Sequence, residues 1–101
     1  MAKLNRTTVL TAKEREALTE SVVEWTVAED YLFRSFEFTN FDAAFRFMTK
    51  VAVIAEEMDH HPDWSNSWNK VEIQITNHQA GGLTEIDFVF GSKISELVTN
   101  G

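Results

Sequence analysis

The chain of 101 residues contains no cysteine, one proline and only four glycines. Without cysteine it has no disulfide, no thiolate metal site and no cysteine nucleophile. No part of the sequence is repeated or of low complexity, and hydrophobic residues, 44% of the total, supply enough apolar surface for one core. Since domains of ~100–150 residues are typical, we expect residues 1–101 to form a single domain.

Positive charge is also scarce, with 9 Lys and Arg against 16 Asp and Glu, for a net charge of −7. Binding to a nucleic-acid backbone needs a clustered basic face, so we expect no nucleic-acid partner. No segment approaches the ~20 apolar residues of a membrane span, and residues 1–10 lack the apolar core of a secretory signal. We therefore expect a cytoplasmic protein with no membrane partner.

Capping boxes mark the starts of two predicted helices. In such a box, two side chains three residues apart satisfy the free N–H groups of the first helical turn. The boxes are Thr11 with Glu14, opening a helix to about Val23, and Thr84 with Asp87, opening a helix to about Val98.

The strongest periodic signal predicts a long helix from the cap Asn40 to Met58. Phe47 and Ile54 widen its apolar stripe to a second face, which is typical of a helix that another subunit also covers. The stripe consists of Phe41, Ala44, Phe45, Met48, Val51, Ala52, Ala55 and Met58.

Residues 25–38 show apolar residues at period two, interrupted by Glu29-Asp30, which predicts a β-hairpin with a tight polar turn. The alternation slips by one position between Phe33 and Phe36. A bulge near Arg34-Ser35 would restore it, and we expect one there.

A second hairpin follows His61-Pro62, because proline forces the preceding residue into extended backbone and ends the helix. The first strand presents Trp64, Asn66 and Trp68 on one face, with a turn at Asn69-Lys70, and Gly81-Gly82 breaks the chain after the second strand. That second strand is predicted to direct Val71, Ile73, Ile75 and Asn77 to one side and Glu72, Gln74, Thr76 and His78 to the other.

The resulting order is α-β-β-α-β-β-α, with two hairpins and no parallel crossover. It predicts an α+β fold in which a four-stranded antiparallel sheet carries three helices packed on one face.

All three histidines lie near the second hairpin: His60 and His61 are adjacent, and His78 ends a strand. An unperturbed imidazole titrates near pH 6.5, so histidines can both donate and accept protons at neutral pH. If the two hairpins share a sheet, His78 comes beside the loop that holds the other two. Such a group can perform acid/base chemistry on a small polar substrate.

Several neighbours are able to support that chemistry. The carboxylates of Glu56, Glu57 and Asp59 lie within reach, and Trp64 offers a flat face for a planar ring. Other interpretations remain open: a histidine at a helix C-terminus often only caps it, Asp87 is more simply the partner of Thr84, and tryptophans are more often core. Three histidines and a carboxylate can also bind zinc, but neither H-x-H nor H-x-x-x-H spacing is present, so we expect no metal.

These residues resemble the pterin-4a-carbinolamine dehydratases. The similarity extends over roughly residues 11 to 98 and includes the stretches FEFTNFDAAFRFMTKVAVIAEEMDHHPDW, WNKVEIQITNH and GGLTEID. The residues at the family's signature spacing are Glu56, His60, His61, Pro62, Trp68, His78 and Asp87.

The resemblance implies dehydration of a 4a-hydroxytetrahydropterin to the quinonoid dihydropterin, a step in tetrahydrobiopterin recycling, without metal or organic cofactor. It implies that His60 and His78 are the acid/base pair and that His61 holds the pterin, with Glu56 and Asp87 as orienting or supporting residues. The implied substrate-binding residues are Asp59, His60, His61, Trp64, Thr76, Asn77, His78 and Gln79.

The chain departs from the family pattern at two positions. Gln79 stands where an acidic residue is common, and Trp68 replaces the usual Tyr or Phe. Neither change removes a proton-transfer residue, so activity is still expected. The resemblance also implies a homodimer or homotetramer through the long second helix and the sheet edge. The alternative function is a non-catalytic dimerisation or coactivator-type binding module on the same fold.

Overall fold

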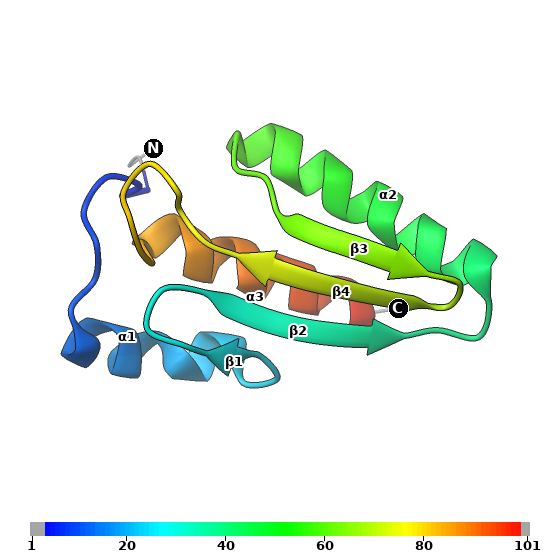
Figure 1. Cartoon of the computed structure of the whole chain (residues 1–101), viewed down its shortest axis with the longest axis horizontal. Coiled ribbons are helices and arrows are strands. Elements are labelled where there is room, and N and C mark those ends of the chain that lie inside the picture. Colours follow the sequence, from blue (N-terminus) through cyan, green and yellow to red (C-terminus); the bar gives the residue numbers. More distant parts are fainter. Residues whose placement is uncertain (1–3, 100–101) are drawn as a thin grey trace.

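The computed structural model describes residues 4–99. Their element order confirms the predicted one, with the first helix continued by a short 3-10 helix, η1 (Figure 1). The elements are α1 (Ala12–Leu18), η1 (Thr19–Val22), β1 (Thr26–Val27), β2 (Leu32–Glu37), α2 (Phe41–Met58), β3 (Asp63–Ser67), β4 (Lys70–Ile75) and α3 (Glu85–Thr99).

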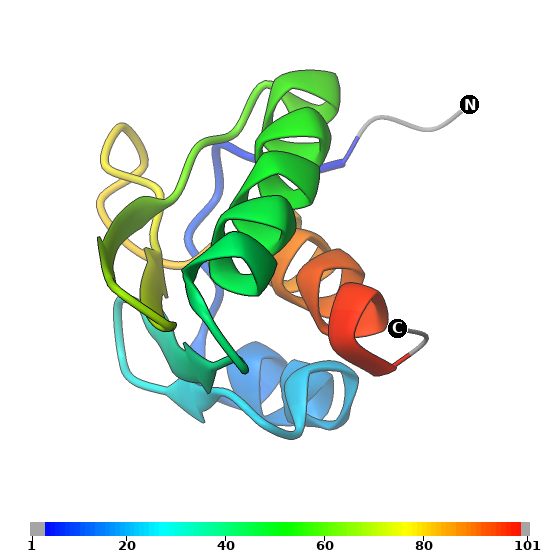
Figure 2. The ribbon, with the colours of Figure 1, turned by 90° about the vertical axis from the view of Figure 1, so that its right-hand side faces the viewer.

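The strands form one four-stranded antiparallel sheet in the order β1-β2-β4-β3. Figure 2 shows all three helices on the same face of this sheet, with α3 between α1 and α2. The predicted α+β architecture is therefore confirmed. The inner face of the sheet is buried because strand alternation directs one apolar row of each central strand toward the helices.

The predicted helix starts are also observed. The Thr11 hydroxyl accepts from the Glu14 N–H at 3.2 Å while the Glu14 carboxylate accepts from the Thr11 N–H at 2.8 Å. The Asn40 side chain accepts from the Ala43 N–H at 2.9 Å and caps α2. The first helix differs from its prediction in one respect, since its α-helical part ends at Leu18 and the chain continues as η1.

Strand β2 does not contain the predicted bulge. Its pairing with β4 is continuous from Leu32 opposite Ile75 to Glu37 opposite Lys70, so the bulge is wrong and Leu32, not Phe33, is the buried residue. The cause is Arg34, whose guanidinium lies 4.5 Å from the centre of the Phe36 ring and donates to Ser95 Oγ at 3.1 Å.

Because a guanidinium binds favourably over an aromatic face, a charged residue occupies an inward position between two apolar ones. Partial burial lowers the pKa of Arg34, and the nearby Glu24 carboxylate acts in the opposite direction. The sequence pattern treats Arg34 as outward, which shifts the expected alternation by one residue.

The second hairpin turns one residue earlier than predicted, at Trp68-Asn69. Trp68 has a φ of +48° and is 64% exposed, so its assignment to a strand face and its alternative as a core residue are both wrong. Trp64 is half-buried and packs against the core. The predicted alternation is confirmed along β4 and just beyond it: Val71, Ile73, Ile75 and Asn77 are all buried.

Helix α2 buries a narrower stripe than its sequence predicts, consisting of Ala44, Phe47, Val51 and Ala55. Phe41 and Phe45 belong to the predicted stripe but are 47% and 52% exposed, with ring centroids 5.6 Å apart. Side chains every three to four residues face the sheet and α3, and these two aromatic residues lie outside that arc.

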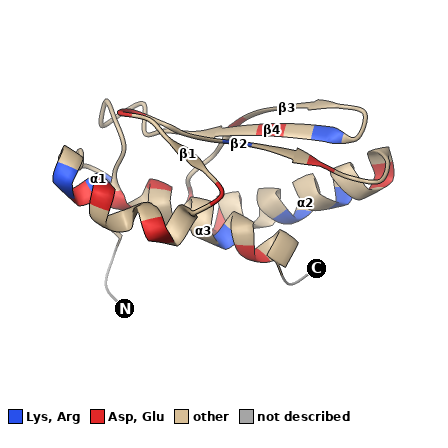
Figure 3. Cartoon of the chain, turned by 90° about the horizontal axis from the view of Figure 1, so that it is seen from below, with Lys and Arg blue, Asp and Glu red and all other residues tan. Residues whose placement is uncertain are grey.

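Charge is spread over the molecule. In the view of Figure 3, the Lys and Arg positions of residues 4–99 are distributed over several elements. Within residues 4–99, no helix combines the length and apolarity needed to cross a membrane.

Candidate functional site

The ends of two helices and two strands lie together at one end of the sheet (Figure 1). They are the end of α2, the start of β3, the end of β4 and the start of α3. Antiparallel pairing causes this, because Asp63 at the start of β3 lies opposite Gln74 near the end of β4. We call this region the histidine end, made of residues 56–63, 76–79 and 84–87. It contains all three histidines.

Helix α2 is capped at its C-terminus by Asp59, which adopts the left-handed conformation with φ 51° and ψ 49°. Its N–H donates to the carbonyls of Ala55 and Glu56, and the His60 N–H donates to Ala55 O at 3.0 Å. A left-handed residue commonly ends a helix in this way, and aspartate tolerates it better than most residues. The turn separates the next two side chains, since that of His60 is 11% exposed and that of His61 is 56% exposed.

His60 points inward to Asp87, with 2.5 Å between His60 Nε2 and Asp87 Oδ1. Asp87 is fully buried, and its Oδ2 also accepts from the Thr84 N–H at 2.7 Å and the Thr84 hydroxyl at 3.1 Å. The predicted pairing with Thr84 is thus present, and the same carboxylate also binds the imidazole. The His60 ring meets Phe90 edge-on at 5.8 Å between centroids, which restricts its rotation further.

The other two histidines also contact carboxylates through Nε2. His61 lies 2.7 Å from Glu56 Oε2, and His78 lies 2.9 Å from Asp63 Oδ2. Both pairs are largely exposed, so each contributes at most about 1 kcal/mol to stability. These pairs instead orient the imidazoles, because a carboxylate accepts from Nε2–H and leaves Nδ1 of the imidazole available.

Sequence reasoning missed Asp63. It stands directly after Pro62 at the start of β3, and its register beside β4 is what places it against His78. The signal was its position in the second hairpin, on the outward face shared with Gln74. Within residues 4–99, no three His, Asp or Glu side chains gather closely enough to hold a metal ion.

Three of the remaining predicted binding residues, Thr76, Asn77 and His78, line a hollow of about 250 Å³ together with Tyr31 and Gln74. The Thr76 hydroxyl donates to Asp30 O at 2.5 Å.

Asn77 is buried and turned inward: its amide donates to Arg6 O at 2.6 Å and its carbonyl accepts from the Ala80 N–H at 3.0 Å. Gln79 is exposed in the turn that follows. The side chain of Asn77 is therefore occupied within the protein, while that of Gln79 is free to reach solvent.

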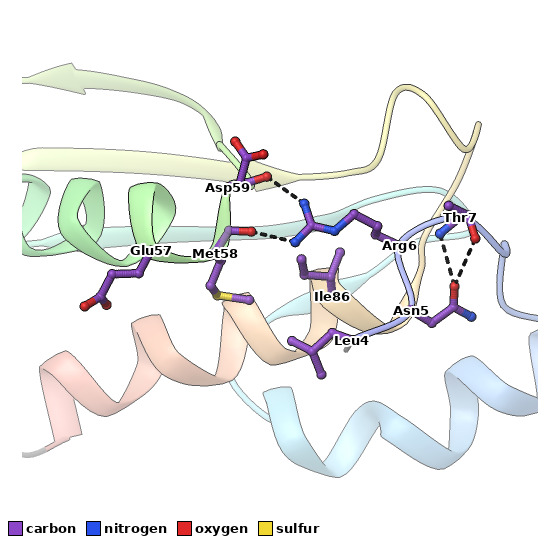
Figure 4. A pocket seen from close by; sticks show the side chains of 8 residues that line it. All are labelled: Leu4, Asn5, Arg6, Thr7, Glu57, Met58, Asp59 and Ile86. Carbon is purple, nitrogen blue, oxygen red and sulfur yellow. Dashed lines mark hydrogen bonds between the residues drawn. The ribbon is translucent and has the colours of Figure 1, made fainter. Parts of the chain in front are cut away.

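A larger hollow of about 830 Å³ lies between the end of α2 and the N-terminal segment and is lined in part by Asp59 (Figure 4). Arg6 crosses it and donates to the carbonyls of Met58 and Asp59. This arginine was also missed by sequence reasoning, since it lies 53 residues before Asp59 and no local pattern connects them.

Comparisons with known proteins agree on one family. The family model described as pterin 4 alpha carbinolamine dehydratase matches residues 8–97. A relative from Rhodopseudomonas palustris, provisionally named pterin-4-alpha-carbinolamine dehydratase, is 48% identical over 90 residues, covering 87% of this chain and 89% of its own. A relative from Rhizorhabdus wittichii with the same provisional name is 46% identical, covering 87% of this chain and 93% of its own.

Among solved structures, the crystal structure of a transcriptional coactivator/pterin dehydratase from Brucella melitensis matches with a TM-score of 0.84. The sequence identity is 33%, and the match covers 89% of this chain and 98% of that one.

Proposed function

The chain belongs to the pterin 4 alpha carbinolamine dehydratase family, and from this premise we propose that it converts a 4a-hydroxytetrahydropterin to the quinonoid dihydropterin by histidine general acid/base catalysis. In the cell this reaction would serve the recycling of tetrahydrobiopterin. A cytoplasmic location remains a prediction from the sequence.

The observation that carries the proposal is the set of three imidazole–carboxylate pairs at the histidine end. In each pair Nε2 binds the carboxylate, so Nδ1 is the nitrogen left to exchange a proton with a substrate. A carboxylate behind an imidazole fixes its tautomer and orientation and stabilises the imidazolium that forms during proton transfer. The buried Asp87 holds His60 most firmly of the three.

The reaction requires two proton transfers. One group removes the proton from N5 of the pterin, and the electron pair of that N–H bond forms the C4a=N5 double bond. The C4a–O bond breaks, and a second group protonates the departing oxygen, so that water leaves. Each positioned acid or base typically contributes ~10²–10⁴-fold to such a rate.

We assign the acid and base roles to His60 and His78 and the binding of the pterin to His61, with Glu56 and Asp87 as orienting residues. The proposed contacts to the ring come from the connections that frame the histidine end. They are Asp59, Trp64, Thr76, Asn77 and Gln79, in addition to the histidines; Asn77 acts by shaping the turn, because its amide is engaged internally.

The test is the rate of dehydration of a 4a-hydroxytetrahydropterin by the wild type and three single variants. We expect His60→Ala and His78→Ala to lower kcat by about 10²-fold or more and His61→Ala mainly to raise KM. Glu37→Gln, on an exposed residue at the other end of β2, is the matched control. Wild-type turnover no faster than the spontaneous reaction, or a His61→Ala variant equal to wild type in both constants, would exclude the proposal.

A second proposal concerns self-association, which the exposed aromatic pair on α2 supports. Phe41 and Phe45 present an apolar surface that a second copy of the chain would cover. Strand β3 is a sheet edge whose outer hydrogen-bonding groups face no strand in the four-stranded order, and it offers a second contact. We propose a homodimer or homotetramer through these two surfaces.

Light scattering at varied concentration tests this second proposal. We expect the wild type to be oligomeric and a Phe41→Ser, Phe45→Ser variant to form smaller species, while Val23→Ser, at another exposed apolar residue, leaves the mass unchanged. A wild type that is monomeric at all concentrations would contradict it. An oligomer without pterin turnover would instead favour the non-catalytic binding module, a role that the wording "transcriptional coactivator" gives to the similar Brucella protein.

A further inference from the structure

The N-terminal residues Asn5 and Arg6 contact the chain neighbours of three site residues, although they lie far from them in sequence. Arg6 binds Asp59, which precedes His60, and its carbonyl accepts from Asn77, which precedes His78. Asn5 binds Ile86, which precedes Asp87. Two consecutive residues therefore connect the three segments that carry the proposed acid, base and supporting carboxylate.

The Arg6 guanidinium forms two hydrogen bonds with the end of α2, and we call this pair of bonds the Arg6 fork. Its Nη2 donates to Met58 O at 2.7 Å and its Nη1 donates to Asp59 O at 2.8 Å. The last carbonyls of a helix have no partner within the helix, and a positive charge there interacts favourably with the helix dipole. The planar guanidinium matches two neighbouring carbonyls, which a lysine ammonium does not do as rigidly.

The backbone of Asn5 and Arg6, which carries this fork, is itself held by hydrogen bonds. The Asn5 N–H donates to Glu85 Oε1 at 2.8 Å, and the Asn5 carbonyl accepts from the Ile86 N–H at 3.1 Å. The Asn77 amide donates to Arg6 O at 2.6 Å. The Arg6 side chain thus extends to the end of α2 from a backbone segment that is hydrogen-bonded to the start of α3 and to the residues that follow β4.

We infer that Arg6 is a positioning residue: it holds the left-handed turn at Asp59 so that His60 meets Asp87 and His61 meets Glu56. This inference rests on the proposed function for its effect on catalysis. A left-handed non-glycine residue is a sparsely populated conformation that persists only where its surroundings hold it. The fork binds the carbonyls on both sides of that residue's own amide and α-carbon, which are the groups that move if the turn relaxes.

The competing interpretation is that Arg6 only fastens the N-terminal segment to the helix and adds stability. The two interpretations differ in what happens to the imidazoles. A displacement of about 1 Å in a catalytic group costs up to about 10²-fold in rate, whereas a purely stabilising contact leaves the folded site unchanged.

The experiment compares Arg6→Ala and Arg6→Lys with Arg46→Ala as the matched control. Arg46 is an exposed arginine of α2 that pairs with Asp42 at 2.7 Å, far along the helix from the histidine end. The measurements are kcat and KM for the pterin, the thermal midpoint, and the imidazole signals of the three histidines by NMR.

For Arg6→Ala we expect kcat to fall about tenfold with KM changed less, and the His60 and His61 ring signals to shift or broaden. The His78 signals should stay as in the wild type, because the backbone carbonyl that binds Asn77 remains. Arg6→Lys should recover part of the loss, since the ammonium keeps the charge and one hydrogen bond. Arg46→Ala should behave as wild type in all signals.

A lower thermal midpoint in Arg6→Ala with wild-type kcat and unchanged His60 and His61 signals would overturn the inference, as would equal losses in Arg6→Ala and Arg46→Ala. If Arg6→Ala does not fold, Arg6→Lys decides by the same signals, with unchanged rings and kcat again overturning it. The imidazole spectra need no substrate. A wild type without turnover would therefore reject the proposed function and still leave the positioning role decided by NMR.

Discussion

The two ends of the sheet are built by different interactions. At one end, which we call the aromatic end, Phe47 lies 4.7 Å from Phe36 and 4.9 Å from Phe38 between ring centroids, and Asn69 closes the adjoining turn by two 2.8 Å bonds with Phe38. At the histidine end, the side-chain contacts include three imidazole–carboxylate pairs and the pair of hydrogen bonds from Arg6 to the end of α2.

The difference shows how stability and side-chain orientation are separated within one small core. Apolar packing is non-directional and is strongest when groups are fully withdrawn from water, so the aromatic end contributes mainly to stability. Hydrogen bonds to ionisable groups are directional and contribute little at the surface, so the histidine end contributes mainly to orientation. His60 and Asp87 are the exception, because they are buried as well as hydrogen-bonded.

The largest expected effect breaks the aromatic end. Phe47→Ala removes a ring that is 5% exposed and should lower the free energy of unfolding by about 3–5 kcal/mol. Chemical denaturation measures this loss, and kcat per folded molecule should change less than about threefold, because the ring lies at the opposite end from the histidines. A large fall in kcat of the folded variant would show that the two ends are coupled, contrary to this comparison.

An intermediate effect is expected where both kinds of interaction meet. Asp87→Asn keeps the shape of the side chain, but the amide cannot accept from both Thr84 and His60 as the carboxylate does. An unsatisfied buried group costs about 1–3 kcal/mol, and we expect kcat to fall about 10–10²-fold. Denaturation and steady-state kinetics give the two values. A variant that loses stability alone would reduce Asp87 to the capping partner of Thr84.

The smallest effect is expected at the exposed pair. Asp63→Asn should leave the free energy of unfolding within about 0.5 kcal/mol of the wild type, since exposed ion pairs contribute little. The rate should still fall by about threefold to tenfold, because His78 loses the acceptor that orients it. Thermal melts and kcat are measured on the same preparation, with Ser65→Ala on the exposed face of β3 as the control. A change in stability with an unchanged rate would reverse this assignment.

Much of the fold follows from local patterns. Two side-chain caps and the alternation of β4 from Val71 to Asn77 are present as predicted, because each depends on residues close together in the chain. One error falls where a distant partner changes a local rule, since Arg34 turns inward to Ser95 and to the ring of Phe36. The error at Trp68 is local, because this residue adopts the left-handed conformation and forms the turn itself.

The site divides in the same way. By itself the sequence determined the identity of the three histidines, the end of the helix at His60-His61-Pro62 and the family, because residue types and spacings carry that information. Only the tertiary structure decided which carboxylate each imidazole meets. Asp63 and Arg6 reach their partners through strand register and through a segment 53 residues away from Asp59, and such contacts follow from packing of the whole chain rather than from any local pattern.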